Sequence, residues 1–379
     1  MEKRDIKVSA PATLAFAIEG LCWDSFAAQI PVLKDHIGAS DSQFGLAMLF
    51  ASAGAVAAMW IAPILDRLLA VRALLVLALG MSGAFLFPGL TTSIILFAVV
   101  MMIASVFSGT LDVIMNARVS EIEVATGRPL MNYHHGVFSV AYALSAFLTG
   151  VARASGFSSW QIFGVILLVV LACSAILLRP TPSRKTESTE STSRFALGWV
   201  ITLVGAVILI AFFAEQATEA WSALHLERSL GAGPVGGALG PTVLGATMAI
   251  GRFSGQYLLR FVSATKLIYV ASVTSALGAF IAAAASSTGI AYLGFVVLGL
   301  GVSVIVPMGF AVLGQVVTDE ARTKAIARAA AFGYIGFFIG PPIMGFLSEW
   351  RGLSASFTFV GIALLLVPLI TLILAKRLR

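Results

Sequence analysis

Four polar residues within one apolar run could hold and pass a proton. Glu215, Glu219, Ser222 and His225 follow a 4-3-3 spacing, which places them along one face of a helix. Two carboxyl groups four residues apart are neighbours on a helix, and a low-dielectric environment opposes the ionisation of both. Glu215 and Glu219 are therefore candidates for proton coupling. Two alternatives stay open: Glu215 binds substrate without coupling, or the group is structural, with Glu219 and His225 meeting periplasmic water.

A second polar stripe marks another apolar run. Its members follow a 3-4-4 spacing: Ser105, Ser108, Asp112 and Asn116. Such a stripe is unfavourable against lipid, so it lines a cavity or packs against other polar groups. Asp112 is a second candidate for proton coupling, and Asn116 for substrate binding. The equally weighted alternative is that Asp112 forms an ion pair with a basic residue such as Arg118 or Arg128.

The next apolar run also has a polar face. Its members are Asn132, His135, Ser139, Tyr142 and Thr149. His134 is rotated by about 100° from this face, so we prefer His135 as the functional histidine. We expect His135, Ser139 and Tyr142 to contact the substrate. A neutral His135 that only hydrogen-bonds a polar neighbour is an open alternative to one that titrates.

Acidic and aromatic residues also occur together near the N-terminus. Glu19 and Trp23 are four residues apart and share a helical face, whereas Asp24 points in a different direction. Glu19 is a further candidate for proton coupling, and Asp24 and Trp23 for substrate binding. A tryptophan beside polar groups suits sugars and other amphipathic rings, and Trp221 with Ser222 offers the same combination. The alternative is that each tryptophan packs or anchors a helix at the membrane interface.

The composition indicates which elements must position these residues. Hydrophobic residues make up 59% of the 379 positions and charged residues only 11%, against about 25% charged in soluble domains. Mean hydropathy is +0.98. A helix needs about 20 apolar residues to cross a bilayer. The apolar segments predict twelve spans: 12–33, 41–66, 73–91, 93–118, 129–152, 159–178, 196–226, 235–259, 266–286, 290–317, 325–349 and 354–375.

The basic residues indicate the orientation of these spans. With a cytoplasmic N-terminus, 20 of the 24 Lys and Arg residues fall on the inside, and only Lys34, Arg153, Arg228 and Arg351 fall on the other side. The positive-inside rule therefore predicts that both termini are cytoplasmic. The formal charge of +6 follows from topology, and no basic–aromatic pattern indicates nucleic-acid binding.

A polar segment and an internal repeat predict two halves. The Ser/Thr-rich stretch 181–194 predicts a cytoplasmic linker between six-helix bundles at 1–180 and 195–379. Shifting the first half by 193 positions places Ile37–Gly38–Ala39 on Leu230–Gly231–Ala232, and Arg67 on Arg260. We therefore expect an all-α polytopic membrane protein with about 12 transmembrane helices in two pseudo-symmetric halves.

Several motifs carry a resemblance to a known family. Segment 62–67, Ala-Pro-Ile-Leu-Asp-Arg, resembles a shortened loop motif of the major facilitator superfamily, and 111–116, Leu-Asp-Val-Ile-Met-Asn, is similar to its fucose-permease-like branch, which includes YbjJ-like inner-membrane members. Glu123, His135 and Trp221–Ser222 fit the same branch. The resemblance covers essentially the whole chain. It implies that Asp66, Arg67 and Arg72 latch the cytoplasmic side, that transport uses alternating access, and that the protein is a monomer.

Two positions depart from that branch. The residue directly before Trp221 is Ala220 where related chains often have an acid, and Gln29 stands where many have Arg. Both positions would line the pathway, so the substrate does not follow from the resemblance.

We therefore expect a secondary active transporter in the cell inner membrane that moves a small polar solute, a sugar or related metabolite, by proton-coupled symport. The alternatives are a proton-driven efflux carrier for drugs or metabolites and a non-transporting receptor on the same fold. The lipid bilayer, the solute and the proton are the expected partners. No motif indicates an enzyme, a cofactor, a metal site or a nucleotide site.

Overall fold

A computed structural model describes residues 3–128, 130–181, 198–259, 261–317 and 319–377. Within these ranges all regular structure is helical. Most of the predicted linker, 182–194, lies outside the described residues, so the division into halves at 181–194 stays a prediction. Chain contacts group residues 1–187 and 233–242 into a first unit, and residues 188–232 and 243–379 into a second.

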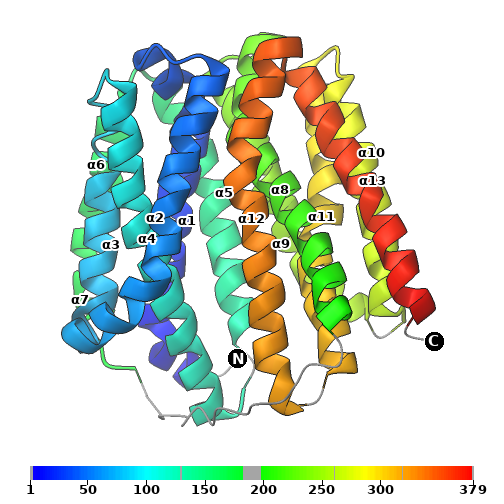
Figure 1. The fold of residues 1–379 in the computed structure, drawn as a ribbon. Coiled ribbons are helices and arrows are strands. Elements are labelled where there is room, and N and C mark those ends of the chain that lie inside the picture. Colours follow the sequence, from blue (N-terminus) through cyan, green and yellow to red (C-terminus); the bar gives the residue numbers. More distant parts are fainter. Residues whose placement is uncertain (1–2, 129, 182–197, 260, 318, 378–379) are drawn as a thin grey trace. The chain divides into compact units, whose positions relative to one another are not determined.

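The helices of the first unit are α1 (Lys3–His36), α2 (Asp41–Leu69), η1 (Ala70–Arg72), α3 (Ala73–Ala84), α4 (Ile94–Thr126), α5 (Met131–Ala154), α6 (Ser159–Ala172) and α7 (Ser174–Leu177). The second unit holds α8 (Gly198–Leu224), η2 (His225–Ser229), most of α9 (Pro234–Leu258), α10 (Ala264–Ala283), α11 (Thr288–Val316), α12 (Asp319–Arg351) and α13 (Leu353–Arg377). In the first unit α1 packs on α5 and α2 on α4; in the second, α8 packs on α12, and α10 on α11 and α13 (Figure 1).

Serine caps explain where several helices begin. The caps of α2, α4, α10 and α11 are Ser40, Ser93, Ser263 and Ser287, and each Oγ accepts a hydrogen bond from the backbone N–H three residues later. These N–H groups have no partner within the helix, so a serine oxygen stabilises each start.

Each of the twelve predicted spans overlaps a described helix. By length and apolar composition, eight described stretches could each cross a membrane: Asp41–Ala84, Ile94–Thr126, Tyr133–Ala154, Gly198–Ser229, Ala264–Ala283, Thr288–Val316, Arg328–Arg351 and Leu353–Lys376. The first stretch contains two predicted spans, because η1 joins α2 to α3 without a break. α6 is apolar but shorter. The number of twelve spans and the cytoplasmic termini stay predictions.

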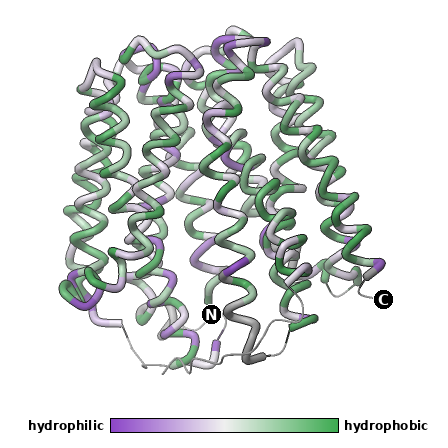
Figure 2. The backbone as a smooth tube through the Cα atoms, viewed as in Figure 1, coloured by the Kyte–Doolittle hydropathy of each residue, from purple (hydrophilic) through white to green (hydrophobic). Residues whose placement is uncertain are grey.

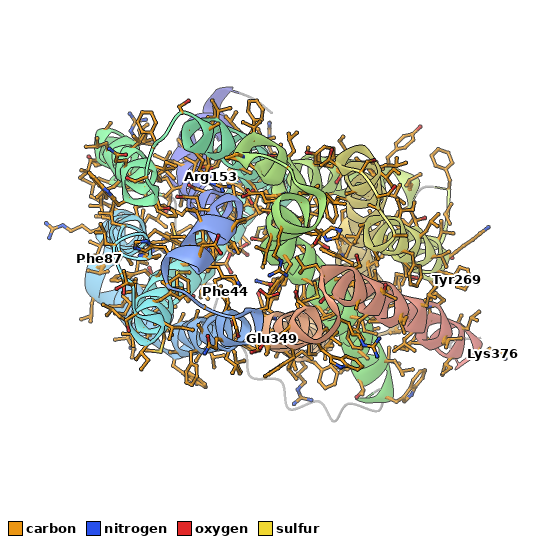
Figure 3. All side chains as sticks on the ribbon, turned by 90° about the horizontal axis from the view of Figure 1, so that it is seen from above. Phe44, Phe87, Arg153, Tyr269, Glu349 and Lys376 are labelled. Carbon is orange, nitrogen blue, oxygen red and sulfur yellow. The ribbon has the colours of Figure 1, made fainter. Side chains whose placement is uncertain are left out.

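The outer surfaces of the helices are apolar. Trp60 is 70% exposed and Ile95 is 75% exposed. Hydrophobic colouring runs along most helices in Figure 2, with many hydrophilic residues near helix ends. In Figure 3, Phe87 and Tyr269 lie at the outside of the first and second units. A soluble protein would rarely expose so much contiguous apolar surface, whereas lipid covers it without cost.

Gly54 allows α2 to approach α4 closely. A Cβ atom at this position would collide with the carbonyl oxygen of Met102, whereas a Cβ at Gly83 in α3 would meet nothing within 4 Å. We expect Gly54→Ala to lower the thermal unfolding midpoint in detergent, because two helix backbones must separate. Gly83→Ala is the matched control and should stabilise by about 0.5–1 kcal/mol through helix propensity. Equal midpoints for the two variants would contradict this packing.

A buried ion pair joins α1 to α2 across the turn at Gly38. Lys34 Nζ lies 3.0 Å from Asp41 Oδ1, and the two side chains are 10% and 5% exposed. We expect Lys34→Met to destabilise the protein by about 3 kcal/mol, because the Asp41 carboxylate would lose its cation in a nearly dry site. Thermal unfolding tests this, and Lys34→Met/Asp41→Asn should recover part of the loss. An unchanged midpoint for Lys34→Met would show that the pair contributes nothing.

Candidate functional site

A chain of hydrogen bonds links α1 to α4 in the first unit. Trp23 Nε1 donates to Ser108 Oγ at 2.8 Å, and Ser108 Oγ donates to Glu19 Oε1 at 2.7 Å. Glu19 is only 6% exposed, and both helices contribute from near their midpoints. The predicted α4 stripe therefore meets the acidic and aromatic residues of α1.

Asp112 completes this cluster. It lies one helical turn beyond Ser108 on α4, and its charge interacts with that of Glu19. Asn116 Nδ2 donates to Asp112 Oδ1 at 2.8 Å, which fixes the orientation of the carboxyl group. Asp112 forms no ion pair among the described residues, so the predicted alternative of pairing with Arg118 is not seen. We call Glu19, Trp23, Ser108, Asp112 and Asn116 the α1–α4 cluster.

The carboxyl groups of this cluster have few partners. Glu19 Oε2 has no hydrogen-bond partner among the described residues, and neither Glu19 nor Asp112 has a described cation beside it. A buried ionised carboxylate needs a cation or several donors to offset its desolvation. The cluster therefore has the composition of a site that takes up a proton or a hydrogen-bond donor.

Trp23 also packs against aromatic rings. Its ring lies edge-on to Phe85 at 5.3 Å and to Phe26 at 6.0 Å between centroids. Asp24, the next residue of α1, is completely buried. Trp23 therefore packs against other aromatic rings, as one of the two interpretations of the sequence expected. Contact of Trp23 and Asp24 with the substrate stays a prediction.

The α5 residues are placed differently from the α1–α4 cluster. His134 is fully buried, with Nδ1 2.8 Å from the Leu130 carbonyl oxygen and Nε2 3.2 Å from Thr13 Oγ1. His135 is partly exposed and lies edge-on to Phe16. This fits a structural His134 and leaves His135 as the candidate.

Two other α5 candidates are buried. Ser139 donates to the His135 carbonyl oxygen at 3.0 Å, and Tyr142 is 4% exposed with its ring near Phe138. Their predicted contact with substrate is not tested by this arrangement.

Glu215 in the second unit has a basic partner. Arg252 Nη2 of α9 donates to Glu215 Oε1 at 3.2 Å, with side chains 26% and 16% exposed. The sequence analysis pairs Glu215 with Glu219 and does not identify this cation. The available signal is that Arg252, one of the 20 basic residues that the topology places on the inside, lies within an apolar run.

The rest of the predicted α8 face is more deeply buried. Ser222, His225 and Trp221 have no exposed surface, and Glu219 is partly exposed. His225 has no exposed surface, so the structure gives no support to its predicted contact with periplasmic water. Trp221 occupies a packing position, and its contact with substrate stays a prediction.

The predicted loop motif makes one contact to another long helix. Arg118 of α4 donates to Asp66 Oδ1 at 2.5 Å and also pairs with Glu121. Arg67 donates to the Pro63 carbonyl oxygen of its own helix, and Arg72 is exposed in η1. Asp66 therefore ties α2 to α4, with Arg118 as the partner that the motif did not identify.

Long apolar helices with carboxyl groups at mid-length define a polytopic membrane protein of the transporter class. The family model described as Major Facilitator Superfamily matches residues 12–292 and 260–379. The chain belongs to the major facilitator superfamily. It is a multi-pass membrane transporter of small-molecule solutes.

Curated relatives and solved structures agree with this assignment. An uncharacterised MFS-type transporter of Yersinia pestis is 30% identical over 368 residues, which cover 93% of this chain and 92% of the relative. The membrane protein MosC of Rhizobium meliloti is 26% identical over 91% of this chain and 84% of its own. A bacterial homologue of the lysosomal transporter Spinster has a TM-score of 0.79 at 14% identity, over 99% of this chain and 98% of its own. A D-xylose–proton symporter has a TM-score of 0.76 at 15% identity, over 97% of each chain. These two structures share the fold.

Proposed function

We propose that the protein is a proton-coupled secondary transporter that moves a small polar solute by alternating access. The observation that carries this proposal is the α1–α4 cluster, where Glu19 and Asp112 interact without a described cation beside either. A proton bound to either of two interacting carboxyl groups removes their repulsion and supplies a hydrogen-bond donor. Uptake of that proton on one side of the membrane and its release on the other would drive transport.

Glu215 takes a different role in this proposal. Arg252 lies beside Glu215 and offsets part of the cost of burying its charge, whereas neither Glu19 nor Asp112 has such a partner among the described residues. We assign the Glu215–Arg252 pair to solute binding or to positioning α8 against α9. Glu219 remains a candidate that could exchange a proton with Glu215.

The polar solute class rests on Trp23. An aromatic ring beside a carboxyl group and a hydroxyl suits a hydroxyl-bearing ring such as a sugar. The similar fold of a D-xylose–proton symporter agrees with a sugar or related metabolite. We also propose twelve spans, cytoplasmic termini, an inner-membrane location, a monomer and membership of the fucose-permease-like branch.

Thermal unfolding of the purified protein with sugars, organic acids, amino acids and drugs, at pH 5.5 and 7.5, identifies the solute, because a ligand of the folded state raises the midpoint. Uptake of that solute into proteoliposomes with an acidic exterior then tests coupling. Hits confined to hydrophobic cations would favour the efflux carrier. Binding without flux would favour the receptor.

A further inference from the structure

The junction between α8 and η2 buries two polar side chains. Ser222 lies in the last α-helical turn, and His225 begins the π-helical turn His225–Ser229. Neither residue has exposed surface. A π turn interrupts the regular hydrogen-bond register and is frequent at functional sites.

The hydrogen bond of His225 to α10 determines which ring nitrogen carries the proton. Nε2 lies 3.0 Å from the carbonyl oxygen of Ala282. A carbonyl oxygen only accepts hydrogen bonds, so Nε2 must be the protonated nitrogen. A second proton would place a positive charge in a fully buried site. Nδ1 is therefore a bare acceptor, and it has no partner among the described residues.

The hydroxyl of Ser222 also lacks a partner among the described residues. Thr218, one turn earlier, satisfies its own hydroxyl by donating to the Ala214 carbonyl oxygen at 2.8 Å. Ser222 makes no such bond. A buried polar group left without a hydrogen bond costs about 1–3 kcal/mol, so two such groups together indicate a missing ligand.

Ser222 and His225 are three residues apart, so their side chains are neighbours on one helical face. One oxygen can hydrogen-bond to both groups when Ser222 Oγ and His225 Nδ1 lie within about 5.6 Å of each other, the length of two hydrogen bonds of about 2.8 Å. Buried aromatic and aliphatic side chains lie around the imidazole: the Phe357 ring is 5.2 Å from it between centroids, and Leu226 is fully buried. Arg228, three residues further along the chain, is the basic residue whose charge acts on His225.

We propose that Ser222 Oγ and His225 Nδ1 form an internal binding site for one hydroxyl group, which donates to Nδ1. The hydroxyl belongs either to an internal water molecule or to the transported solute. Either occupant satisfies both orphaned atoms. This site does not depend on proton coupling at the α1–α4 cluster, and the experiment that tests it does not measure transport. Either proposal can therefore be wrong while the other is right.

Nitrogen-15 NMR of the full-length protein with labelled histidine tests this site. The chain has four histidines, and His225→Gln identifies the His225 signals by their loss. We expect a protonated Nε2 and an Nδ1 whose shift lies between those of a protonated and a free nitrogen, because it accepts a hydrogen bond. Ser222→Ala should move the Nδ1 signal, whereas Thr218→Ala should not.

The source of the hydroxyl is distinguished by adding D-xylose and D-glucose at saturating concentration. An Nδ1 signal that does not change and that exchanges magnetisation with water protons supports internal water. A signal that changes with one sugar supports a solute hydroxyl. A protonated Nδ1, or a free-acceptor shift in the unmodified protein, would overturn the proposal even if Ser222→Ala failed to fold.

Discussion

Glu19→Gln is expected to reduce pH-gradient-driven uptake to the level of empty liposomes, while solute exchange at equal pH on both sides continues. Glutamine has nearly the shape of glutamic acid and can still accept the hydrogen bond from Ser108, but it cannot bind or release a proton. The variant therefore separates coupling from folding and binding. The measurement is uptake of the identified solute into proteoliposomes, with and without an acidic exterior.

The control for this prediction is Glu121→Gln. Glu121 lies on α4, pairs with Arg118 and has a side chain 26% exposed, so the same chemical change occurs outside the α1–α4 cluster. Glu121→Gln should retain gradient-driven uptake. If Glu19→Gln retained it to the same extent, Glu19 would have no part in coupling.

Arg252→Gln is expected to impair both folding and transport. It would leave the Glu215 carboxylate, 16% exposed, without a cation. Breaking a fully buried pair costs about 3–5 kcal/mol, and partial exposure reduces this to about 2 kcal/mol. We expect a lower unfolding midpoint, and we expect reduced uptake because the Glu215–Arg252 pair is assigned to solute binding or to positioning α8 against α9.

The double variant Glu215→Gln/Arg252→Gln separates the two effects. It removes both charges, so the unfolding midpoint should recover while uptake stays low. Arg228→Gln is the matched control, because Arg228 is exposed and donates a hydrogen bond to the Ser348 hydroxyl. If Arg252→Gln were as stable and as active as Arg228→Gln, the Glu215–Arg252 pair would contribute neither to stability nor to transport.

Two positions that the predicted internal repeat superposes share a backbone conformation. Gly38 and Gly231, which the shift of 193 residues superposes, both adopt left-handed φ values, +61° and +69°. Each follows the first long helix of its repeat. Glycine takes this conformation without the steric cost that other residues meet, so the requirement is visible in one sequence.

Helical spacing also grouped the α4 stripe correctly. Ser108, Asp112 and Asn116 share a face, and that face meets Glu19 and Trp23 of α1. Spacing fixes which residues of one helix point together, but not which helix lies opposite. For that reason Arg252 was missed as the partner of Glu215, and Arg118 was considered for Asp112 although it pairs with Asp66.

The hydropathy pattern predicted where the helices lie more accurately than it predicted where each membrane span begins and ends. The predicted span 41–66 and the first part of the predicted span 73–91 form one continuous helical stretch, Asp41–Ala84, and the chain leaves the helix after Ala84. α1 is not among the eight apolar stretches, because it carries polar residues such as Glu19 and Asp24 that lower its hydropathy. The residues that suggest a function in α1 are thus the same ones that weaken its membrane signal.

Proton movement during solute entry tests the central claim most directly. A pH-sensitive dye is enclosed in proteoliposomes that hold the purified protein, and the identified solute is added outside with no pH gradient imposed. Solute entry coupled to protons should acidify the interior, and Glu19→Gln should abolish the acidification. Solute entry at the normal rate with no change in internal pH would contradict proton-coupled transport.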